Sequence, residues 1–292
     1  MKKKSEYKNR IFSFIRIPAV MMGFMMLHNG CAADQNRDFF KAPSLQKILK
    51  RGVLRAGTTG DYRPLSFPDP ASGRYAGFDA ELAKDLADDL GVEIEFVPTS
   101  WPALMNDVYA DRFDLAICGI TINDARKEKA LMSSGYLKNG KTILCRAADA
   151  GKFTGLSAVN RPEVRVMVNP GGFNEQFARE NFTDATLIVH NDNQQIPALV
   201  AEGKADIMIT ETVEAGYYAS HDERLAAPLI HEPFTCDELG ILMPKGSEDL
   251  LEYVNGFLLK EKKTGRIGEL AEMYSIRYAE PGPANAHKKT EQ

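Results

Sequence analysis

The sequence predicts an α/β protein with two lobes, each built around a mainly parallel β-sheet. Strands and helices alternate over residues 53–120 and again over residues 164–220, as they do in parallel sheets. The strands expected at 113–120 and 205–209 are nearly all apolar, which is typical of strands that are buried on both faces. Extended chain joins the two series, so we expect two lobes and not one continuous sheet.

The first series begins with a strand over residues 53–57 that ends in the turn Thr58–Asp61. A helix follows, and Asp79 is its expected N-cap. One apolar stripe marks the buried face of this helix: Leu82, Leu86 and Leu90. Gly91 has the place of a C′ glycine and should end the helix.

The other expected elements follow from the same periodicities. The strands are expected at 92–97, 113–120, 164–168, 186–190, 205–209 and 242–244. The helices are expected at 101–110, 174–180, 193–202, 211–220, 247–261 and 266–274. Ligands of such sheets bind beyond the carboxyl ends of the strands, so the turns at those ends are the candidate site.

The two ends of the chain differ in composition from the rest. A basic start, an apolar run over 17–27 and small residues at 30–33 have the order of a secretory signal peptide. We therefore expect residues 1–33 to be a signal peptide and the mature chain to be periplasmic or secreted. An uncleaved N-terminal anchor and a lipoprotein attached through Cys31 are the alternatives. The polar, proline-rich stretch 279–292 is expected to be a flexible tail.

Composition narrows the classes of partner. The formal net charge of −4 does not support nucleic-acid binding, which usually leaves a basic footprint. Cys118, Cys145 and Cys236 follow the signal region, and no Cys or His cluster has the spacing of metal ligands. We therefore expect no nucleic acid, no metal and no cofactor. Homo-oligomerisation is left open.

Three segments resemble the lobes of family 3 extracytoplasmic solute-binding proteins: residues 75–130, GKADIMITE and LMPKGSEDLLEYVNGFL. The resemblance implies the type II periplasmic-binding-protein-like fold, in which two crossover strands join two α/β lobes around a cleft. The crossovers would fall near 136–143 and 232–240. The first lobe would then comprise 34–140 plus 236–278, and the second 141–235. A disulfide between Cys145 and Cys236, near the two crossovers, is left open.

Further segments resemble the cyclohexadienyl dehydratases within that superfamily. These segments are TTGDYRPLSF, PTSWPALM, ITIN, NGKT, VNPGGFNEQFAREN, VHNDN and TETVEA. The resemblance implies conversion of prephenate to phenylpyruvate, of arogenate to phenylalanine, or both. The substrate would be a small dicarboxylate or an amino acid. The alternative is an amino-acid-binding protein that serves an ABC transporter, and a transporter partner is expected under that alternative alone.

Arg126 follows the expected strand that ends in Gly119 and Thr121. In amino-acid receptors of the family the matching arginine grips the ligand carboxylate, helped by backbone N–H groups and a hydroxyl. A planar guanidinium suits this role because it meets a carboxylate with two parallel hydrogen bonds. The competing interpretation is a solvated arginine at a helix start, as expected for Lys127 and Lys129.

The glycine turn Asn169–Asn174 precedes an expected helix. Backbone amides at a helix start can bind an anion. The family position therefore predicts that Gly172 and Asn174 contact the ligand. A tight βα connection without a ligand role is the alternative.

Glu211 and Glu214 decide between enzyme and receptor. The receptors usually have an aspartate at the first position, which binds the ligand ammonium. The dehydratases have a glutamate three residues later as general acid, and Glu214 matches it. The spacing predicts that both carboxyls share one helix face, where Glu211 would raise the pKa of Glu214 and the helix dipole would lower it. Alternatively, two acidic residues open a helix and complement its dipole.

Tyr62 and Trp101 are expected to form ring-stacking walls of the cleft, although structural aromatic residues are common. Lys141 is expected at the junction of the lobes, where it meets a second carboxylate of the substrate or is an exposed hinge residue. Two departures from the dehydratase pattern bear on function. Leu239 follows Glu238 where the dehydratases have a lysine, and Glu211 replaces an aspartate. Either departure could mark a changed substrate preference or a relative that only binds.

Overall fold

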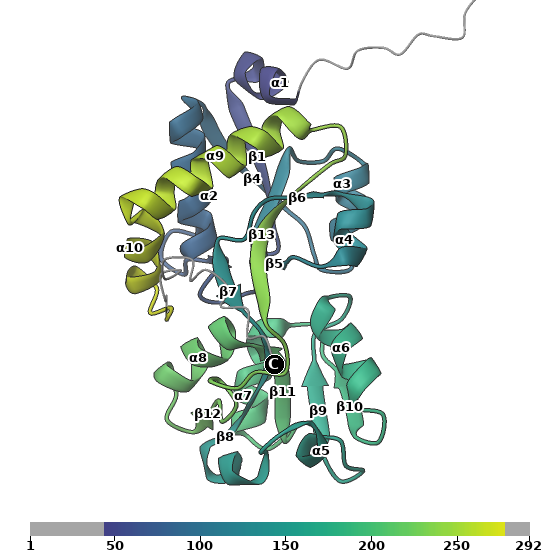
Figure 1. Ribbon diagram of the computed structural model, residues 1–292. Helices are drawn as coiled ribbons and strands as arrows, with labels where there is room; N and C mark the ends of the chain where they lie inside the picture. Colours follow the sequence, from purple (N-terminus) through teal and green to yellow (C-terminus); the bar gives the residue numbers. More distant parts are fainter. Residues whose placement is uncertain (1–43, 278–292) are drawn as a thin grey trace, which may run out of the picture. The chain divides into compact units, whose positions relative to one another are not determined.

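A computed structural model describes residues 44–277 (Figure 1). The predicted signal peptide at 1–33 and the predicted tail at 279–292 lie outside the described residues, so both stay predictions. Within 44–277, no helix combines the length and the apolar character that crossing a bilayer requires.

The first lobe contains a sheet with the strand order β4–β1–β5–β13–β6, and β7 also pairs with β13. Its strands are β1 (Val53–Thr58), β4 (Glu93–Pro98), β5 (Leu115–Thr121), β6 (Leu131–Met132), β7 (Leu137–Asn139) and β13 (Asp237–Met243). β1 is parallel to β4 and β5, and β13 is antiparallel to β5.

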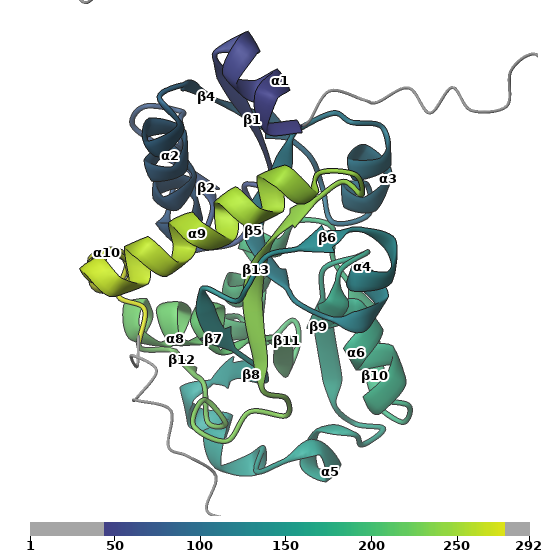
Figure 2. The ribbon, with the colours of Figure 1, turned by 45° about the horizontal axis from the view of Figure 1, so that its top comes forward.

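Helices cover both faces of this sheet (Figure 2). The helices packed in one core are α2 (Phe78–Leu90), α9 (Glu248–Thr264) and α10 (Arg266–Met273). On the other face α3 (Leu104–Tyr109) packs in a second core. Alternate residues of β5 enter the two cores, for example Ile117 in the first and Cys118 in the second. This double burial explains the all-apolar sequence of the strand.

The second lobe contains a sheet with the strand order β10–β9–β11–β8–β12. Its strands are β8 (Lys141–Arg146), β9 (Arg165–Val168), β10 (Thr186–Val189), β11 (Ile207–Glu211) and β12 (Leu225–Ala226). One face packs against α6 (Phe173–Asn181), and the other against α7 (Ile196–Ala201) and α8 (Thr212–His221). β9, β10 and β11 are parallel, so their carboxyl ends share one edge of the sheet.

The remaining elements are short or lie at the edges of the lobes. They are α1 (Ser44–Arg51), β2 (Phe67–Pro68), β3 (Tyr75–Ala76), α4 (Asp124–Lys129), η1 (Ala147–Lys152), α5 (Leu156–Val159) and η2 (Asn193–Gln195).

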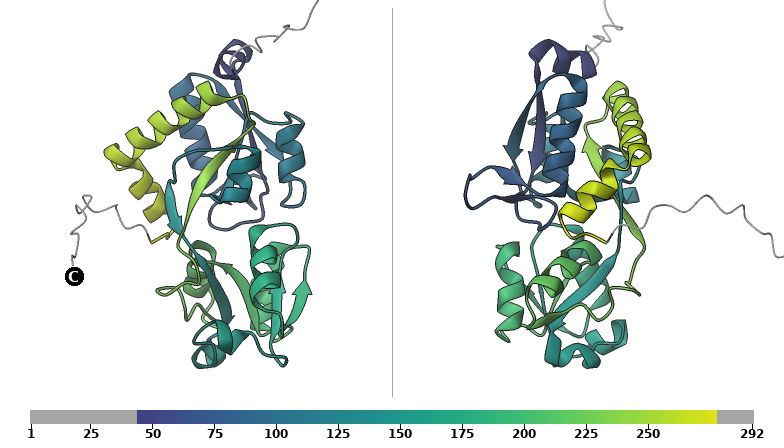
Figure 3. Two further views of the ribbon diagram at one scale, coloured as in Figure 1. Left: turned by 45° about the vertical axis from the view of Figure 1, so that its right-hand side comes forward. Right: turned by 90° about the vertical axis from the view of Figure 1, so that its left-hand side faces the viewer.

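Two neighbouring segments carry the chain between the lobes (Figure 3). β7 leads directly into β8, and it pairs antiparallel with β13, which returns to the first sheet. The Phe234 N–H donates to the carbonyl of Lys141 at 2.7 Å, so the two segments also meet at the edge of the second lobe. The predicted fold, two α/β lobes joined by two crossovers, is confirmed. The exact residue bounds given to each lobe stay a prediction.

The predicted N-cap of α2 is wrong. Gly77 caps the helix, and its φ of 116° is unfavourable for residues with a Cβ. A Cβ there would also lie 2.3 Å from the Leu65 carbonyl oxygen. Asp79 instead turns into the core, where Oδ2 accepts from the Gly119 N–H at 2.5 Å and from the Tyr136 hydroxyl at 2.9 Å.

Several predicted boundaries also shift. The helix expected at 101–110 begins at Leu104, and the one expected at 193–202 divides into η2 and α7. β13 begins at Asp237, well before the expected 242, because it pairs with β7. Glu211 is the last residue of β11, paired with Lys141 in β8, and not a helical residue. The two glutamates therefore approach the site from a strand end and a helix start, and not from one helix face.

The three cysteines within residues 44–277 are free thiols. Cys145 is buried in the core of the second lobe, whereas Cys236 is exposed. The disulfide between them is therefore absent, because the Cys145 side chain is buried in the second-lobe core while Cys236 is exposed.

Candidate functional site

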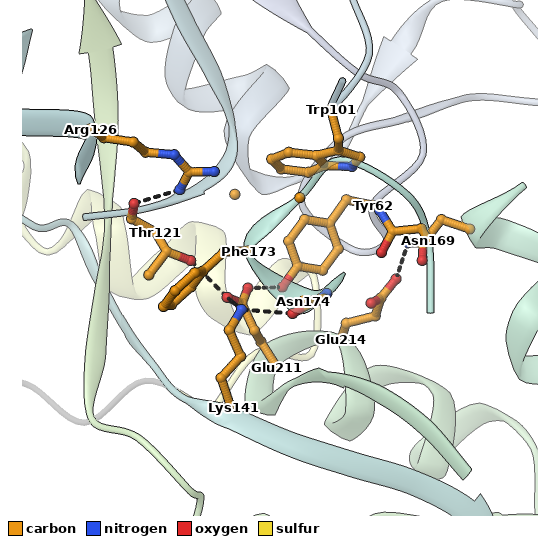
Figure 4. Close-up of a pocket in the computed structure, with 13 residues that line it drawn as sticks. Tyr62, Trp101, Thr121, Arg126, Lys141, Asn169, Phe173, Asn174, Glu211 and Glu214 are labelled. Atoms are coloured by element: carbon orange, nitrogen blue, oxygen red, sulfur yellow. Dashed lines mark hydrogen bonds and ion pairs between the residues drawn. The ribbon is translucent and has the colours of Figure 1, made fainter. Parts of the chain in front are cut away.

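A pocket lies where turns and strand ends of the two lobes meet (Figure 4). The first lobe contributes five residues: Tyr62, Trp101, Gly119, Thr121 and Arg126. The second lobe contributes eight: Lys141, Asn169, Gly172, Phe173, Asn174, Asn193, Glu211 and Glu214. The ten residues that the sequence singled out are all among them. Their proximity is a finding, and their roles stay proposals.

Glu211 is buried under four side-chain donors. Oε1 accepts from Thr121 Oγ1 at 2.7 Å and from Lys141 Nζ, while Oε2 accepts from Asn139 Nδ2 at 2.8 Å and from the Tyr62 hydroxyl. Burial alone would raise the pKa of Glu211, but the Lys141 ammonium and these hydrogen bonds hold it below its usual range. Each carboxylate oxygen already accepts two hydrogen bonds, so Glu211 is suited to hold its neighbours in place as a buried anion.

Lys141 is buried, with 1% of its surface exposed, and is not the exposed hinge residue of the alternative interpretation. Its ammonium donates to Glu211 and to Asn174 Oδ1 at 2.6 Å, and lies 4.5 Å from the centre of the Phe173 ring. Three groups therefore fix the ammonium at the pocket wall, where its charge is available to an anionic ligand.

Glu214 is fully buried near the opposite side of the pocket. Its Oε1 accepts from Asn193 Nδ2 at 2.9 Å, and Oε2 accepts from the Thr210 hydroxyl. Burial raises the pKa of Glu214 well above its usual value, and the charges of Asp61 and Glu211 add to this shift against the two hydrogen bonds. These surroundings therefore favour the protonated form of the carboxyl.

Arg126 is the third residue of α4, which Asn123 caps by accepting from the Arg126 N–H at 2.9 Å. The side chain is partly buried, and one guanidinium nitrogen donates to the Thr121 carbonyl at 2.6 Å. That bond leaves the other edge of the guanidinium toward the pocket. Burial lowers the pKa of Arg126, but an arginine stays charged in proteins.

Two aromatic rings wall the first-lobe side. Tyr62 and Trp101 meet edge to face with their centroids 6.1 Å apart. The indole N–H donates to Asp61 Oδ1 at 3.1 Å, which fixes the ring. Gly119 has φ 77°, and a Cβ there would lie 2.4 Å from the Tyr62 ring. Glycine at this strand end therefore allows the tyrosine to pack against the backbone.

The turn before α6 borders the pocket, as predicted. Gly172 caps α6, and Asn174 reaches Lys141. Asn169 is buried, and its Oδ1 has no hydrogen-bond partner among the described residues. The turn therefore presents backbone and an unpaired amide oxygen to a ligand.

Sequence reasoning passed over Asn169, Phe173 and Asn193 as individual residues. All three lie inside segments that carry the resemblance, VNPGGFNEQFAREN and VHNDN. Because asparagine is common in turns and phenylalanine is common in cores, their residue types alone gave no sign of a pocket role.

Leu239 is fully buried in the core of the first lobe and pairs with Thr121 and Leu137 across β13. Among the described residues it does not line the pocket. Leu239 therefore contributes to the packing of the first lobe near the crossover. In the described part of the chain, no group of three or more His, Cys, Asp or Glu residues has a metal-binding arrangement.

The profile of the bacterial extracellular solute-binding proteins, family 3, matches residues 54–276. The chain belongs to this family. It is also 40% identical over 245 residues to the cyclohexadienyl dehydratase of Pseudomonas aeruginosa, covering 84% of this chain and 89% of that protein.

Two solved structures are similar to this chain. One is an ancestral cyclohexadienyl dehydratase, 51% identical, with a TM-score of 0.51 over 80% of this chain and 97% of that one. The other is an ancestral amino acid-binding protein, described as a precursor of cyclohexadienyl dehydratase. It is 38% identical, with a TM-score of 0.74 over 79% of this chain and 99% of that one.

Proposed function

We propose that the protein is a cyclohexadienyl dehydratase, a carbon–oxygen lyase that acts on prephenate, on arogenate or on both. The observation that carries this proposal is the full burial of Glu214, which favours a carboxyl that keeps its proton, in a pocket whose other carboxyl, Glu211, already accepts from four side-chain donors. The likeness to the Pseudomonas aeruginosa enzyme supports the same activity.

The reaction needs an acid and anchors for two carboxylates. The ring carboxylate leaves as CO2, and the electrons of its C–C bond move through the ring as the C–O bond to the hydroxyl breaks. The hydroxyl takes one proton and leaves as water, so the ring becomes aromatic. Glu214 would supply that proton, because a general acid must carry it at the working pH.

Charge in the pocket suits an anionic substrate. Arg126 and Lys141 are cations and Glu211 is an anion, so with Glu214 protonated, as a general acid must be, these four groups carry a net positive charge. Arg126 would bind one carboxylate with two hydrogen bonds, and Lys141 would meet the second. Tyr62 and Trp101 would hold the ring between them.

Saturation of Glu211 argues against a receptor that binds an amino acid through this carboxylate. A ligand ammonium would have to displace Lys141 or a neutral donor from oxygens that already accept two bonds each. Displacing Lys141 would leave a buried ammonium without its anion, which is costly.

Purified protein should convert prephenate to phenylpyruvate, which absorbs strongly in alkali, and arogenate should be assayed beside it by the phenylalanine formed. Calorimetry with a panel of amino acids completes the comparison. No product from either substrate, together with tight binding of an amino acid, would replace the enzyme with a transport receptor.

We also propose that the chain is exported to the periplasm or secreted, after removal of residues 1–33. The family profile and the tripartite N-terminus support this. Sequencing the N-terminus of the exported protein tests it, and retention of Met1 would count against cleavage. Lipid on Cys31 would indicate the lipoprotein alternative.

A further inference from the structure

Asn193 begins η2 in the second lobe and lines the pocket beside Glu214. It is 3% exposed. Asp192 accepts from the Gln194 N–H at 3.0 Å and so fixes the start of this turn.

Both N–H groups of the Asn193 amide have acceptors. Nδ2 donates to Glu214 Oε1 at 2.9 Å and to the backbone carbonyl of Asp61 at 3.0 Å. A flipped amide would place Oδ1 against the Asp61 carbonyl oxygen, which cannot donate. This carbonyl therefore fixes which end of the amide is oxygen.

The amide oxygen is the unusual atom. Asn193 Oδ1 is buried and has no hydrogen-bond partner among the described residues. A buried acceptor left unpaired is unfavourable, so this oxygen favours a ligand that brings a donor. Prephenate offers carboxylate and ketone oxygens, which accept, and a single O–H, which is the ring hydroxyl that must leave.

We propose that Asn193 binds the leaving hydroxyl through Oδ1 while its Nδ2 holds the acid Glu214 in line with that hydroxyl. This inference rests on the proposed dehydratase function. The hydroxyl donates its hydrogen to Oδ1, which leaves its oxygen lone pairs toward the Glu214 carboxyl. The Glu214 proton then moves to that oxygen, the C–O bond breaks with both electrons on oxygen, and water leaves as CO2 is lost from the ring.

The hydrogen bond from Asn193 Nδ2 to the Asp61 carbonyl also connects the second lobe to the first. Gln194, the next residue, makes a second such contact through Nε2, which donates to the Gly60 carbonyl at 3.0 Å. Gln194 does not border the pocket among the described residues. It is therefore a matched control that removes a contact between the lobes without touching Glu214.

The experiment compares Asn193→Leu, Asn193→Ser and Gln194→Leu by kcat, KM and the pH profile of kcat. Both Asn193 variants should lower kcat on the order of 10–10²-fold, because a small misplacement of reacting groups can cost that much. The Asn193 bond lowers the pKa of Glu214, so its loss should move the basic limb of the profile to higher pH. Gln194→Leu should leave the limb in place.

A double variant shows whether the effect runs through the acid. In the Glu214→Gln background, Asn193→Leu should lower kcat by less than about threefold, because coupled residues give strongly non-additive losses. Three results would overturn the inference: kcat within about threefold of wild type in both Asn193 variants, an unmoved basic limb, or equal effects from Gln194→Leu. Thermal melting identifies a variant that fails to fold, and Asn193→Ser keeps the test available in that case.

A different result contradicts the proposed function: folded wild-type protein gives no product from prephenate or arogenate. The link to the acid is then measured by carbon NMR titration of Glu214 in wild-type protein and in Asn193→Leu. An unchanged Glu214 pKa would overturn the inference, whereas a higher Glu214 pKa in Asn193→Leu would support the hydrogen bond from Asn193 to this carboxyl.

Discussion

At the scale of single residues, the surroundings of two carboxyls in one pocket shift their pKa values in opposite directions. Glu211 faces an ammonium and three neutral donors, whereas Glu214 is buried with two neutral donors and nearby negative charge. Where the surroundings of two carboxyls shift their pKa values apart, the carboxyl with the raised pKa is suited to be the acid and the one with the lowered pKa to be the anion. Glu214 therefore fits the acid, and Glu211 fits the anion that holds Lys141.

Glu214→Gln should lower kcat by roughly 10²–10⁴-fold, because glutamine keeps the size of the side chain but has no proton to transfer. Substrate affinity should change little. Glu211→Gln is the companion variant, and it should mainly weaken substrate binding, since it removes the anion that keeps the buried Lys141 charged against the effect of burial. Steady-state kinetics separate the two, and a larger fall in kcat from Glu211→Gln would exchange the roles.

Arg126→Ala should weaken substrate binding by about 2–5 kcal/mol, the usual loss when one member of a desolvated charge pair is removed. This corresponds to roughly 30-fold or more in affinity. Lys127→Ala is the control, because Lys127 is exposed on the same helix. Calorimetry with phenylpyruvate measures both, and a loss under about tenfold for Arg126→Ala would place the carboxylate elsewhere.

At the scale of elements, periodicity predicted the strands and helices well where burial is one-sided or complete. β5 was predictable because apolar residues on both of its faces meet covering helices. Ends were less predictable. Asp79 has the residue type of an N-cap, but its carboxyl bonds to Gly119 and Tyr136, which are distant in sequence. Such long-range partners leave no local pattern.

The start of α2 depends on Gly77. Gly77→Ala should lower the free energy of unfolding by about 1–3 kcal/mol more than Gly73→Ala does, because the new methyl group would press on the Leu65 carbonyl. Gly73 is the matched control, since its φ is also positive but no described atom lies within 4 Å of a Cβ there. Urea unfolding measures both, and equal losses would show that backbone conformation alone matters.

At the scale of the whole molecule, the resemblance located the pocket because each lobe supplies its residues from the ends of its strands. All ten residues expected there line it. Family positions could not predict the pairing of Lys141 with Glu211 or the unpaired oxygen of Asn193. Both depend on side chains that meet across separate elements. The place of Leu239 also needed the structure, because neighbouring residues of a strand face opposite sides.

The buried carboxyl of Asp79 in α2 accepts hydrogen bonds from Gly119 in β5 and from Tyr136. Because of this carboxyl, the stability of the protein should fall as the pH rises. Burial raises the pKa of Asp79 from 3.8 to about 7, against the hydrogen bonds from Tyr136 and Gly119. A carboxyl whose folded pKa is raised gives its full stabilisation below pH 3.8 and loses it as pH rises through about 7. The wild-type protein should therefore lose free energy of unfolding between pH 5 and pH 8.

Asp79→Asn should lose less over that range, by on the order of 1–4 kcal/mol, since the amide does not ionise and its oxygen can accept both bonds. Other buried carboxyls, Glu214 included, titrate in both proteins and cancel in the comparison. Asp88→Asn, an exposed change on the same helix, should keep the wild-type pH dependence. Urea unfolding at pH 5 and pH 8 measures all three proteins. Equal pH dependence in wild type and Asp79→Asn would mean that Asp79 stays ionised in the folded protein. The hydrogen bonds from the Gly119 N–H and the Tyr136 hydroxyl would then stabilise its charge.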